Sequence, residues 1–402
     1  MFLDAMRCRP WAPVALVLSL GGCGQVAVQP TSPAQASAAP STSIDIRIGH
    51  VAPLTGGIRH LGKDNENGTR LAVDQANAAM IRIGGKVANF VLITEDDQAN
   101  PQVGVTVAQK LVAAKVAGVV GHLNSGCSIP ASSIYDQAGI PVISPSSTNP
   151  ALTELGSRVQ FRVIGRDDEQ GQAIATYLAL TVKPKVVAII DDSTVYGEVL
   201  ADSVEVTLKS NNIEVLAREK GTDRTSDWRA VLATVQDKKP DAIFYGGMDS
   251  TAGPLMKQAR ELGIKALFLS GEGVCIDEMN RLSGGAAEGM LCTQHGIPIT
   301  ALATKFVDAY KVKFNIVPIL YAPFAYDATN VLIEAMKKAD SADPAKYLPE
   351  LTKLSFTGAT GRIAFDKKGD RKDAPLTMYT MKGGKIKPIA IIRGRERMTL
   401  DQ

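Results

Sequence analysis

Two polar loops between Gly121 and Asn149 carry the side chains of this chain that are best suited to bind a small charged ligand. Two short apolar runs, Val116–Val120 and Ile140–Ser144, each stop in a cluster of Ser, Thr, Asn and Gly, with a helix-length segment between them. In an open parallel sheet, loops at the carboxyl ends of strands line the ligand crevice. Hydroxyls and free N–H groups at a helix N-terminus suit an anion such as a carboxylate. The same residues also form ordinary turns, but two such loops at neighbouring strand ends favour a small-ligand site.

The elements that must position these loops alternate regularly along the chain. Strands separated by helices of ten or more residues predict parallel βαβ units with right-handed crossovers. These units are too many for one modest sheet, so we predict an α/β fold of two doubly wound lobes. The predicted strands are Ile44–Val51, Val87–Thr94, Val116–Val120, Ile140–Ser144, Val186–Ile190, Glu214–Arg218, Ala242–Tyr245 and Ala266–Leu269, and the predicted helices are Gly68–Ala79, Val103–Ala114, Ile129–Ala138, Gln170–Thr181, Glu198–Asn211, Trp228–Asp237 and Thr251–Leu262.

The C-terminal part of the chain breaks this rhythm. A Gly383-Gly384 turn joins its last two strands, as is typical of a hairpin. Because these strands need a sheet or helix to cover their apolar faces, we expect the chain to return to the two lobes and to form a hinge where it crosses. We predict the helices Ala301–Phe314, Tyr321–Lys338 and Lys346–Leu354, the strands Ile363–Phe365, Leu376–Met381 and Ile386–Ile392, and lobes built from residues 44–165 plus 296–375 and from residues 166–295 plus 376–402.

The N-terminus predicts export. Arg7 and Arg9 precede the apolar run Trp11–Leu20, which is too short to span a bilayer as a mature helix. The run ends in Leu-Gly-Gly-Cys, which resembles a bacterial lipobox, where cleavage before Cys23 leaves that residue free for acylation. Ordinary cleavage further on, near Ala36–Ala39, is the alternative. Either reading places the protein outside the cytoplasm, and the first one anchors it to a membrane from the periplasm.

Composition limits the remaining possibilities. Residues 1–22 are predicted to be the signal peptide, and residues 23–43, which are small and rich in Pro and Ser, a lipid-anchored flexible tether that cannot build a core. Loss of the signal peptide lowers the net charge of +3 by one unit, which leaves no electrostatic footprint for nucleic acid. A hydrophobic fraction of 45% with only 5% aromatic residues suits tightly packed α/β layers.

Four cysteines remain after residue 22: Cys23, Cys127, Cys275 and Cys292. If Cys23 is acylated, three thiols remain, an odd number for an oxidising compartment. Cys275 follows one predicted strand and Cys292 lies in the next short one, so we predict a disulfide between them across a small loop and a free Cys127. The absence of C-x-x-C and His-rich spacings argues against a metal site.

Ten motifs spread over nearly all of the chain after the tether carry a family resemblance by their order and spacing. They are IGHVAPLTG from Ile48, NGTRLAVDQAN from Asn67, GHLNS from Gly121, PASSIY from Pro130, ISPSSTNP from Ile143, YGE from Tyr196, YGG from Tyr245, GEGV from Gly271, AAEG from Ala286 and FDKKGD from Phe365. With them, the chain resembles type I periplasmic binding proteins of the branched-chain amino acid (Leu/Ile/Val) transport family. The resemblance implies two Rossmann-like lobes, joined by three crossovers, that close on a ligand.

The resemblance also implies roles for four residues in binding a free amino acid. Ser125 matches the serine that takes the α-carboxylate through its backbone N–H and hydroxyl. Thr148 matches the threonine whose N–H joins that carboxylate and whose hydroxyl faces the ammonium, and Ser146 the position whose C=O faces the ammonium. Glu272, in the second lobe, matches the carboxylate that pairs with the ammonium. A buried zwitterion needs each charge met by hydrogen bonds, because desolvation otherwise defeats binding.

The side-chain pocket departs from the family pattern. Leu61 and Met248 stand where branched-chain binders have tyrosines, whereas Tyr196 is retained. Asn124 stands where one such protein has a disulfide cysteine, and Ala99 stands at the position of its partner. Because Leu and Met are narrower and softer than Tyr, these changes enlarge or reshape the pocket. An aliphatic, branched-chain amino acid is the expected ligand, with polar analogues or a larger side chain as the alternative.

Two function classes other than transport are compatible with parts of the sequence. His122 beside Ser125 and Cys127 is compatible with nucleophilic catalysis, but H-E-x-x-H, G-x-S-x-G, Walker and G-x-G-x-x-G signatures are absent. A histidine that ends a strand is more often a structural hydrogen bonder, so we predict a protein that is not an enzyme and needs no cofactor. Its expected partners are an amino acid and the membrane subunits of an ABC permease, and we expect a monomer. A sensor of amino acids or amides that acts on a receptor is the alternative.

Overall fold

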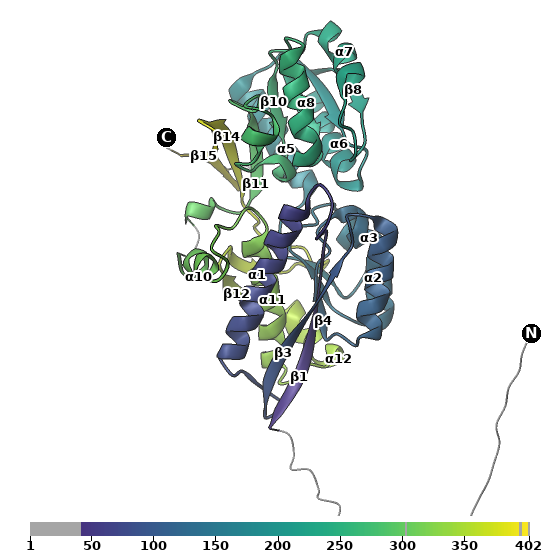
Figure 1. The fold of residues 1–402 in the computed structure, drawn as a ribbon, viewed down its shortest axis with the longest axis vertical. Helices are drawn as coiled ribbons and strands as arrows, with labels where there is room; N and C mark the ends of the chain where they lie inside the picture. Colours follow the sequence, from purple (N-terminus) through teal and green to yellow (C-terminus); the bar gives the residue numbers. More distant parts are fainter. Residues whose placement is uncertain (1–41, 302–303, 394–395, 401–402) are drawn as a thin grey trace, which may run out of the picture. The chain divides into compact units, whose positions relative to one another are not determined.

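The structure, a computed structural model, describes residues 42–301, 304–393 and 396–400, and its strands form two large sheets (Figure 1). The first sheet is parallel except for β2, which pairs antiparallel with β3. The chain runs from β1, near the middle, to β3 on one side and from β4 to β5 on the other, so the sheet is doubly wound. In spatial order its strands are β2 (Arg82–Ile83), β3 (Lys86–Asp96), β1 (Ser43–Ala52), β4 (Gly118–Val120), β5 (Val142–Ser144) and β6 (Gln160–Arg162).

The second sheet combines a parallel part with an antiparallel edge. Strands β7, β8, β9, β10 and β11 are mutually parallel. At the edge, β14 pairs antiparallel with β11, β15 with β14, and β16 with β15. The antiparallel edge contains the Gly-Gly hairpin that the sequence predicts. In spatial order its strands are β16 (Glu396–Thr399), β15 (Lys385–Arg393), β14 (Leu376–Lys382), β11 (Leu291–His295), β10 (Leu267–Ser270), β9 (Ala242–Gly246), β7 (Val186–Asp191) and β8 (Glu214–Lys220).

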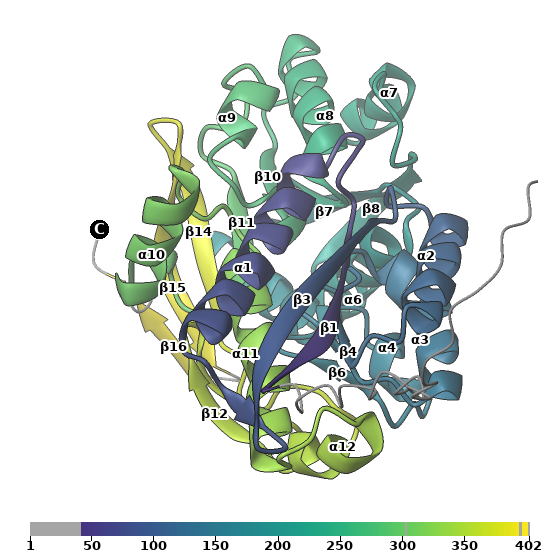
Figure 2. The ribbon, with the colours of Figure 1, turned by 60° about the horizontal axis from the view of Figure 1, so that its bottom comes forward.

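Helices cover both faces of the first sheet (Figure 2). As a result, β1 buries side chains on both of its sides. Ile46 and Ile48 join a cluster with Leu332, whereas Val51 joins a second cluster with Leu111. The pair α1 and α11 packs on one side, and the pair α2 and α3 packs on the other. The helices of this lobe, called lobe 1, are α1 (Arg59–Ala78), α2 (Pro101–Ala113), α3 (Ser125–Ala138), α4 (Ala151–Glu154), α10 (Thr304–Phe314), α11 (Ala322–Lys338) and α12 (Pro344–Thr352).

The second sheet and its helices form lobe 2. Trp228 is fully buried there, where its Nε1 donates to the backbone oxygen of Thr251 at 3.1 Å and its ring meets Tyr245 edge-on. A π-helical turn (Leu178–Val182) continues α5, and a 3-10 turn (Glu272–Val274) follows β10. The helices are α5 (Asp167–Tyr177), α6 (Val195–Ser210), α7 (Arg229–Lys238), α8 (Asp249–Glu261) and α9 (Met279–Leu282).

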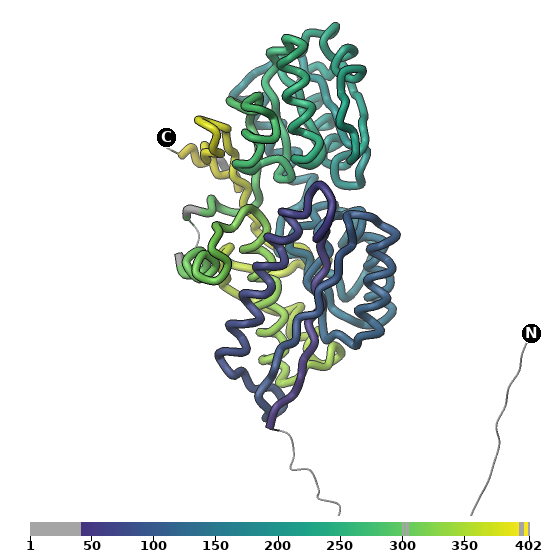
Figure 3. Tube along the Cα trace, viewed as in Figure 1, coloured from purple at the N-terminus to yellow at the C-terminus, as the bar shows by residue number. Residues whose placement is uncertain are grey.

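The chain passes between the two lobes after β6, after β11 and after β13 (Gly361–Ala364), which pairs with β12 (Ser355–Gly358) beside α11 (Figure 3). The buried carboxylate of Asp370 ties the first and third crossings together. It accepts from Nε of Arg162 at 2.6 Å and from Nη1 of Arg166 at 2.8 Å. These ion pairs hold the connecting segments in a defined register between the lobes.

Several predicted helix starts were wrong. The helix expected from Ile129 begins at Ser125, and the helix expected from Gly68 begins nine residues earlier, at Arg59. The helix continues through Gly62 and Gly68, and both glycines permit close packing. A side chain at either position would collide with a backbone oxygen, that of Pro53 or that of Ala322. Four of the five polar residues between the two glycines, from Asp64 to Asn67, are buried by tertiary contacts instead of marking a loop, whereas Lys63 is exposed.

The predicted signal peptide, Cys23 and nearly all of the predicted tether lie outside the described residues; Ser43, at the end of that tether, already belongs to β1. Among the helices of the described ranges, none has the length and apolarity to cross a membrane.

Candidate ligand-binding site

Loops at the carboxyl ends of parallel strands in both lobes carry the predicted binding residues. This is the position where open α/β sheets bind ligands. Lobe 1 contributes the loops after β4 and β5, and lobe 2 contributes those after β7, β9 and β10. The residues are Ser125 after β4, Ser146 and Thr148 after β5, Tyr196 after β7, Met248 after β9 and Glu272 after β10.

The N-terminus of α3 presents donors to this site. Asn124 is the extended residue before the helix and Ser125 is its first residue. The hydroxyl oxygen of Ser125 accepts from the backbone N–H of Asn149 at 3.3 Å, and the Ser147 hydroxyl donates to the backbone oxygen of His122 at 3.1 Å. These bonds hold the two loops of lobe 1 together. The first N–H groups of a helix lack intrahelical acceptors and face the positive end of its dipole, so this end favours a carboxylate.

Glu272 supplies a buried carboxyl group from lobe 2. Only 1% of the residue is exposed, and the Tyr196 hydroxyl donates to its Oε2 at 3.0 Å. Burial raises the pKa of Glu272, although interactions with Gln170, Tyr196 and Thr148 oppose that rise. The group is therefore poised to gain from a nearby positive charge.

Asp167 is a second buried carboxyl group, which the sequence reasoning missed. It begins α5, and its N–H donates to the backbone oxygen of Thr148 at 2.9 Å. Neither of its carboxyl oxygens has a hydrogen-bond partner of good geometry, although the nearby side chain of Thr148 acts to lower its pKa. Burial and then the charge of Glu272 raise its pKa well above the ordinary value. Sequence patterns do not distinguish this residue, because Asp167-Asp168-Glu169 resembles the acidic first turn of any helix.

These acceptors form a group that suits one kind of ligand. Besides both oxygens of Asp167, Oγ1 of Thr148 and Oε1 of Gln170 are buried without a partner of good geometry. Buried acceptors left unpaired are costly, and two buried carboxyl groups near each other are more so. An ammonium group carries three donors and a positive charge. The arrangement can therefore hold an ammonium on its acidic side and a carboxylate at α3.

A cavity of about 620 Å³ lies beside this group. Asn124, Tyr196 and Met248 line it, together with Ala99. The remaining predicted residues are outside its lining: Ser125, Ser146, Thr148, Glu272 and Leu61 are all buried, and Leu61 is fully enclosed in the core of lobe 1. A larger, more open cavity of about 860 Å³ lies elsewhere, against α4 and α12, and contains none of the predicted residues.

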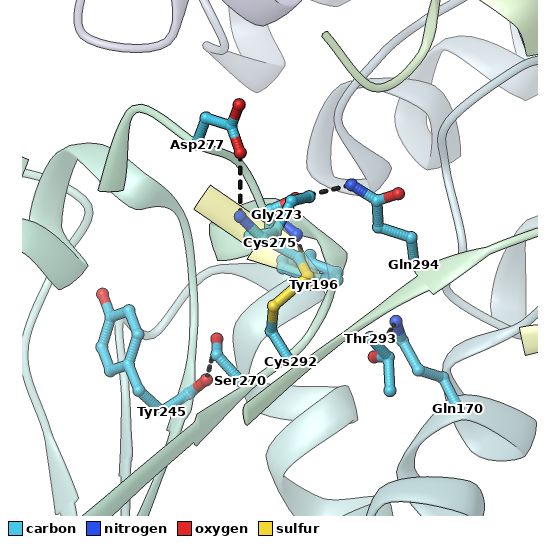
Figure 4. Close-up of a disulfide and its surroundings, with 11 residues drawn as sticks. Gln170, Tyr196, Tyr245, Ser270, Gly273, Cys275, Asp277, Cys292, Thr293 and Gln294 are labelled. Carbon is cyan, nitrogen blue, oxygen red and sulfur yellow. Dashed lines mark hydrogen bonds between the residues drawn. A yellow bond between two sulfur atoms is a disulfide. The ribbon is translucent and has the colours of Figure 1, made fainter. Parts of the chain in front are cut away.

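A disulfide fixes the segment that carries Glu272. Cys275 and Cys292, the two cysteines paired in the sequence analysis, are joined in the structure with their Cα atoms 5.4 Å apart (Figure 4). The side chain of Gln294 also donates to the backbone oxygen of Cys275 at 2.6 Å. The bridge therefore ties the turn of Glu272 to β11, close to Tyr196.

Comparison with known proteins decides the family. Residues 45–385 match the family described as "Periplasmic binding protein". The chain belongs to this periplasmic binding protein family. Leu/Ile/Val-binding protein homolog 2 of Brucella abortus (strain 2308) is 34% identical over 346 residues, which cover 85% of this chain and 91% of that protein. The leucine-, isoleucine-, valine-, threonine-, and alanine-binding protein of Pseudomonas aeruginosa is 32% identical, with coverage of 83% and 89%.

A solved structure gives the same picture of the fold. The branched-chain amino acid transporter substrate-binding protein of Streptococcus pneumoniae, in complex with isoleucine, has a TM-score of 0.80 and 28% identity to this chain. The comparison covers 87% of this chain and 100% of that one. The two-lobed α/β architecture is therefore that of a type I periplasmic binding protein.

His122 has a structural role in this member of the binding-protein family. Its Nδ1 lies 2.9 Å from Oδ2 of Asp97 and its Nε2 lies 3.1 Å from the Tyr135 hydroxyl, so both ring nitrogens are engaged away from Ser125. Burial raises the pKa of the Cys127 thiol, which keeps it protonated and a poor nucleophile. The histidine is thus the hydrogen bonder that the sequence favours.

The two lobes of the binding protein also contact each other directly across the site. Nε2 of His60, near the start of α1, lies 2.8 Å from Oδ2 of Asp249 at the start of α8. The side chain of Asn149 donates to the backbone oxygen of Val195 at 2.8 Å. These contacts join the loops that carry the lobe 1 residues to those that carry the lobe 2 residues.

Proposed function

We propose that the protein is an extracytoplasmic solute-binding protein that captures a free L-α-amino acid between its lobes, without altering it, and delivers it to an ABC permease. The observation that carries the proposal is the group of buried acceptors around Glu272 and Asp167. Thr148 belongs to this group, and the next residue, Asn149, donates its N–H to the Ser125 hydroxyl at the N-terminus of α3. An amino acid is the small molecule whose two charges match both ends. The Leu/Ile/Val-binding names of the relatives support an amino acid as the class of ligand.

In this proposal each charge of the ligand meets a defined set of residues. Ser125 binds the carboxylate through its N–H and hydroxyl, and the backbone N–H of Thr148 joins it. The carboxyl group of Glu272 pairs with the ammonium, with the C=O of Ser146 and the hydroxyl of Thr148 as further acceptors. To this set we add Asp167, whose unpaired oxygens support a second ion pair. Charge-assisted hydrogen bonds of this kind offset the desolvation of a buried zwitterion.

We further propose lobe boundaries at residues 44–165 plus 296–375 and 166–295 plus 376–402. The proposed carboxylate ligands come from lobe 1, whereas Glu272 and Asp167 come from lobe 2. Binding energy that exists only when both lobes touch the ligand shifts an open–closed equilibrium toward the closed state. A permease can then recognise closure instead of the chemistry of the ligand.

The N-terminal part of the proposal concerns attachment. We propose that residues 1–22 are removed and that a lipid on Cys23 anchors a monomeric binding protein to a membrane through residues 23–43. Cys23→Ser should then move the protein from the membrane fraction to the soluble extracytoplasmic fraction. Retention of that variant in the membrane fraction would contradict a lipid at this cysteine.

Titration calorimetry tests the proposed ligand class. The protein is unfolded, dialysed to remove endogenous ligand and refolded, and is then titrated with each of the common L-amino acids. We expect a 1:1 complex with at least one of them. For the amino acid that binds, its amide lacks the carboxylate and its deaminated acid lacks the ammonium, so both analogues should fail. Silence for every amino acid, or equal binding of both analogues, would overturn the proposal.

A further inference from the structure

The side chain of Arg162, at the end of β6, joins a crossing between the lobes to a loop of the proposed ligand site. The residue is fully buried. Its Nε donates to the carboxylate of Asp370, on the third crossing, at 2.6 Å. Its Nη1 donates to the backbone oxygen of Ser147 at 3.0 Å, and its Nη2 donates to the hydroxyl of Thr153 in α4 at 2.8 Å. A guanidinium presents its donors in a rigid plane, so these three acceptors are fixed relative to one another.

Ser147 lies between two residues of the proposed ligand site, Ser146 and Thr148. Its N–H donates to the Ser144 hydroxyl at 2.8 Å, and its own hydroxyl donates to backbone oxygens of the loop after β4. The bond from Arg162 engages its carbonyl as well. Each polar group of Ser147 is therefore held, and the peptide group that follows it has a fixed orientation.

The orientation of that peptide group determines where the N–H of Thr148 points. The peptide bond between Ser147 and Thr148 is trans. In a planar trans peptide the C=O and the N–H point in opposite directions, so this N–H points away from Arg162. Thr148 is fully buried, and its N–H makes no hydrogen bond to any of the described residues. Buried N–H groups rarely lack a partner, and in the proposed function the ligand's carboxylate is that partner.

The charge of Arg162 also strengthens this donor, because a hydrogen bond to the carbonyl polarises the whole peptide group. Stability alone does not require an arginine here. Replacement of a buried ion pair by apolar residues of similar volume is often neutral or stabilising. An arginine that pairs with Asp370 and also orients a ligand-binding peptide has a reason to be retained.

We propose that Arg162 is a positioning residue for the ligand's carboxylate. It binds the oxygen of Ser147 and thereby directs the N–H of Thr148 toward the carboxylate, and its ion pair with Asp370 fixes that peptide group to the crossings between the lobes. Arg162 does not touch the ligand. This inference rests on the proposed function, because it requires an α-carboxylate at the Thr148 N–H.

A second triad of the same residue types provides a matched control. Nη1 of Arg371 donates to the Thr360 hydroxyl at 2.9 Å, and that hydroxyl donates to the buried carboxylate of Asp327 at 2.6 Å. In the first triad the Thr153 hydroxyl likewise accepts from the arginine and donates to the aspartate, at 2.8 Å. The other acceptors of Arg371 lie outside the ligand loop and are the backbone oxygens of Val163, Thr360 and Arg362.

The variants remove one threonine hydroxyl at a time. Thr153→Val keeps the shape of the side chain but removes both bonds that hold the guanidinium plane against α4, whereas Thr153→Ser restores them. Thr360→Val makes the same change in the control triad. Arg162→Lys keeps the charge, but a single ammonium cannot reproduce the planar fork, and Arg371→Lys is its control.

Calorimetry on refolded protein measures the effect on binding. The parent is titrated with each of the common L-amino acids, and the one that binds most tightly is the probe for every variant. Thermal unfolding without ligand establishes that each variant is folded. We expect affinity to fall about five-fold in Thr153→Val and about ten-fold or more in Arg162→Lys. Thr153→Ser, Thr360→Val and Arg371→Lys should stay within about two-fold of the parent, although the two control variants lose stability.

The two threonines decide the matter even if Arg162→Lys does not fold. Parent-like affinity in folded Thr153→Val, an equal loss in Thr360→Val, or no recovery in Thr153→Ser would overturn the role of Arg162 and leave the proposed function intact. Parent-like affinity in folded Arg162→Lys would do the same. Silence of the parent for every amino acid would overturn both proposals.

Discussion

Asp64 in lobe 1 and Asp167 in lobe 2 are both buried, but their carboxyl groups differ in their hydrogen-bond partners. Asp64, in α1, accepts from the backbone N–H groups of residues 319–322 at 2.8–2.9 Å and from the Tyr310 hydroxyl at 3.0 Å, next to the start of α11. Asp167, at the start of α5, has no partner of good geometry for either carboxyl oxygen, although the nearby side chain of Thr148 acts to lower its pKa. Burial raises the pKa of both groups, so burial alone does not distinguish structure from function. The number of hydrogen bonds to the carboxyl group does distinguish them: those of Asp64 stabilise the fold, whereas Asp167 can still accept hydrogen bonds from a ligand.

The largest effect on stability should come from removing the carboxyl group of Asp64, which is fully hydrogen-bonded. Asp64→Ala leaves four backbone N–H groups, three of them buried, and one hydroxyl without their acceptor, each at about 1–3 kcal/mol if water cannot reach it. We expect the free energy of unfolding to fall by about 3–5 kcal/mol. Asp167→Asn removes a buried like charge next to Glu272 and should change it by less than about 1 kcal/mol. Urea unfolding of both variants measures this contrast, and equal losses would contradict it.

Ligand affinity, in contrast, should depend on the residues of the proposed binding site. Glu272→Ala strands the ligand's ammonium beside a single carboxyl group and should cost about 2–5 kcal/mol of binding free energy. Asp167→Asn keeps the shape and removes one charge, so a smaller loss is expected, and Ser125→Ala should also lose less because its backbone N–H remains. Calorimetry with the amino acid that binds the parent gives these differences. Parent-like affinity in Glu272→Ala would show that this residue does not hold the ammonium.

The sequence can predict the role of a polar residue when its hydrogen-bond partners are close in the chain. It cannot do so when those partners are distant in the chain. The strand and helix periods locate the loops at the strand ends, and the resemblance assigns Ser125, Thr148 and Glu272. The roles of Asp64 and Asp167 depend on partners or empty space set by tertiary structure. Asp64 meets residues more than 250 positions away, so no local pattern could reveal its role.

Short elements were missed for a related reason. Strand β6 spans three residues and contains Arg162, which is a poor strand signal until its fully buried guanidinium is seen to pair with Asp370. The decisive fact is which oxygen or nitrogen atom is satisfied, and sequence patterns do not contain it.

A smaller loss of stability should follow from opening the disulfide. Cys275 and Cys292 enclose a short loop, with a sequence separation of 17, so their bridge is worth about 2–4 kcal/mol. The double variant Cys275→Ser/Cys292→Ser should lose that amount and should bind the ligand more weakly, because the turn of Glu272 loses its tie to β11. Mass spectrometry of a non-reduced digest should link the two peptides of the parent. Two free thiols there would contradict the pairing.

The smallest expected effect is a pH dependence at the contact between lobes. Burial alone would lower the pKa of His60, but the hydrogen bond and charge of Asp249, helped by the charges of Glu278 and Asp64, raise it above its ordinary value of 6.5. A raised pKa in the paired state means that protonated His60 stabilises the contact. That stabilisation is fully present below about pH 6.5, the value of an unpaired histidine, and is lost as the pH rises through the raised pKa of the paired state.

Ligand affinity should therefore fall several-fold as the pH rises from about 6 to about 9 if the contact forms only when the lobes close on the ligand. His60→Gln is the control, because it cannot gain a charge in this range. Protonation of Glu272 and Asp167 at lower pH weakens ammonium binding in the parent and the variant alike, so the ratio of their dissociation constants isolates His60. That ratio should favour the parent at pH 6 and approach a constant value at pH 9. A ratio independent of pH would show that the pair between His60 and Asp249 exists equally in the open and closed states.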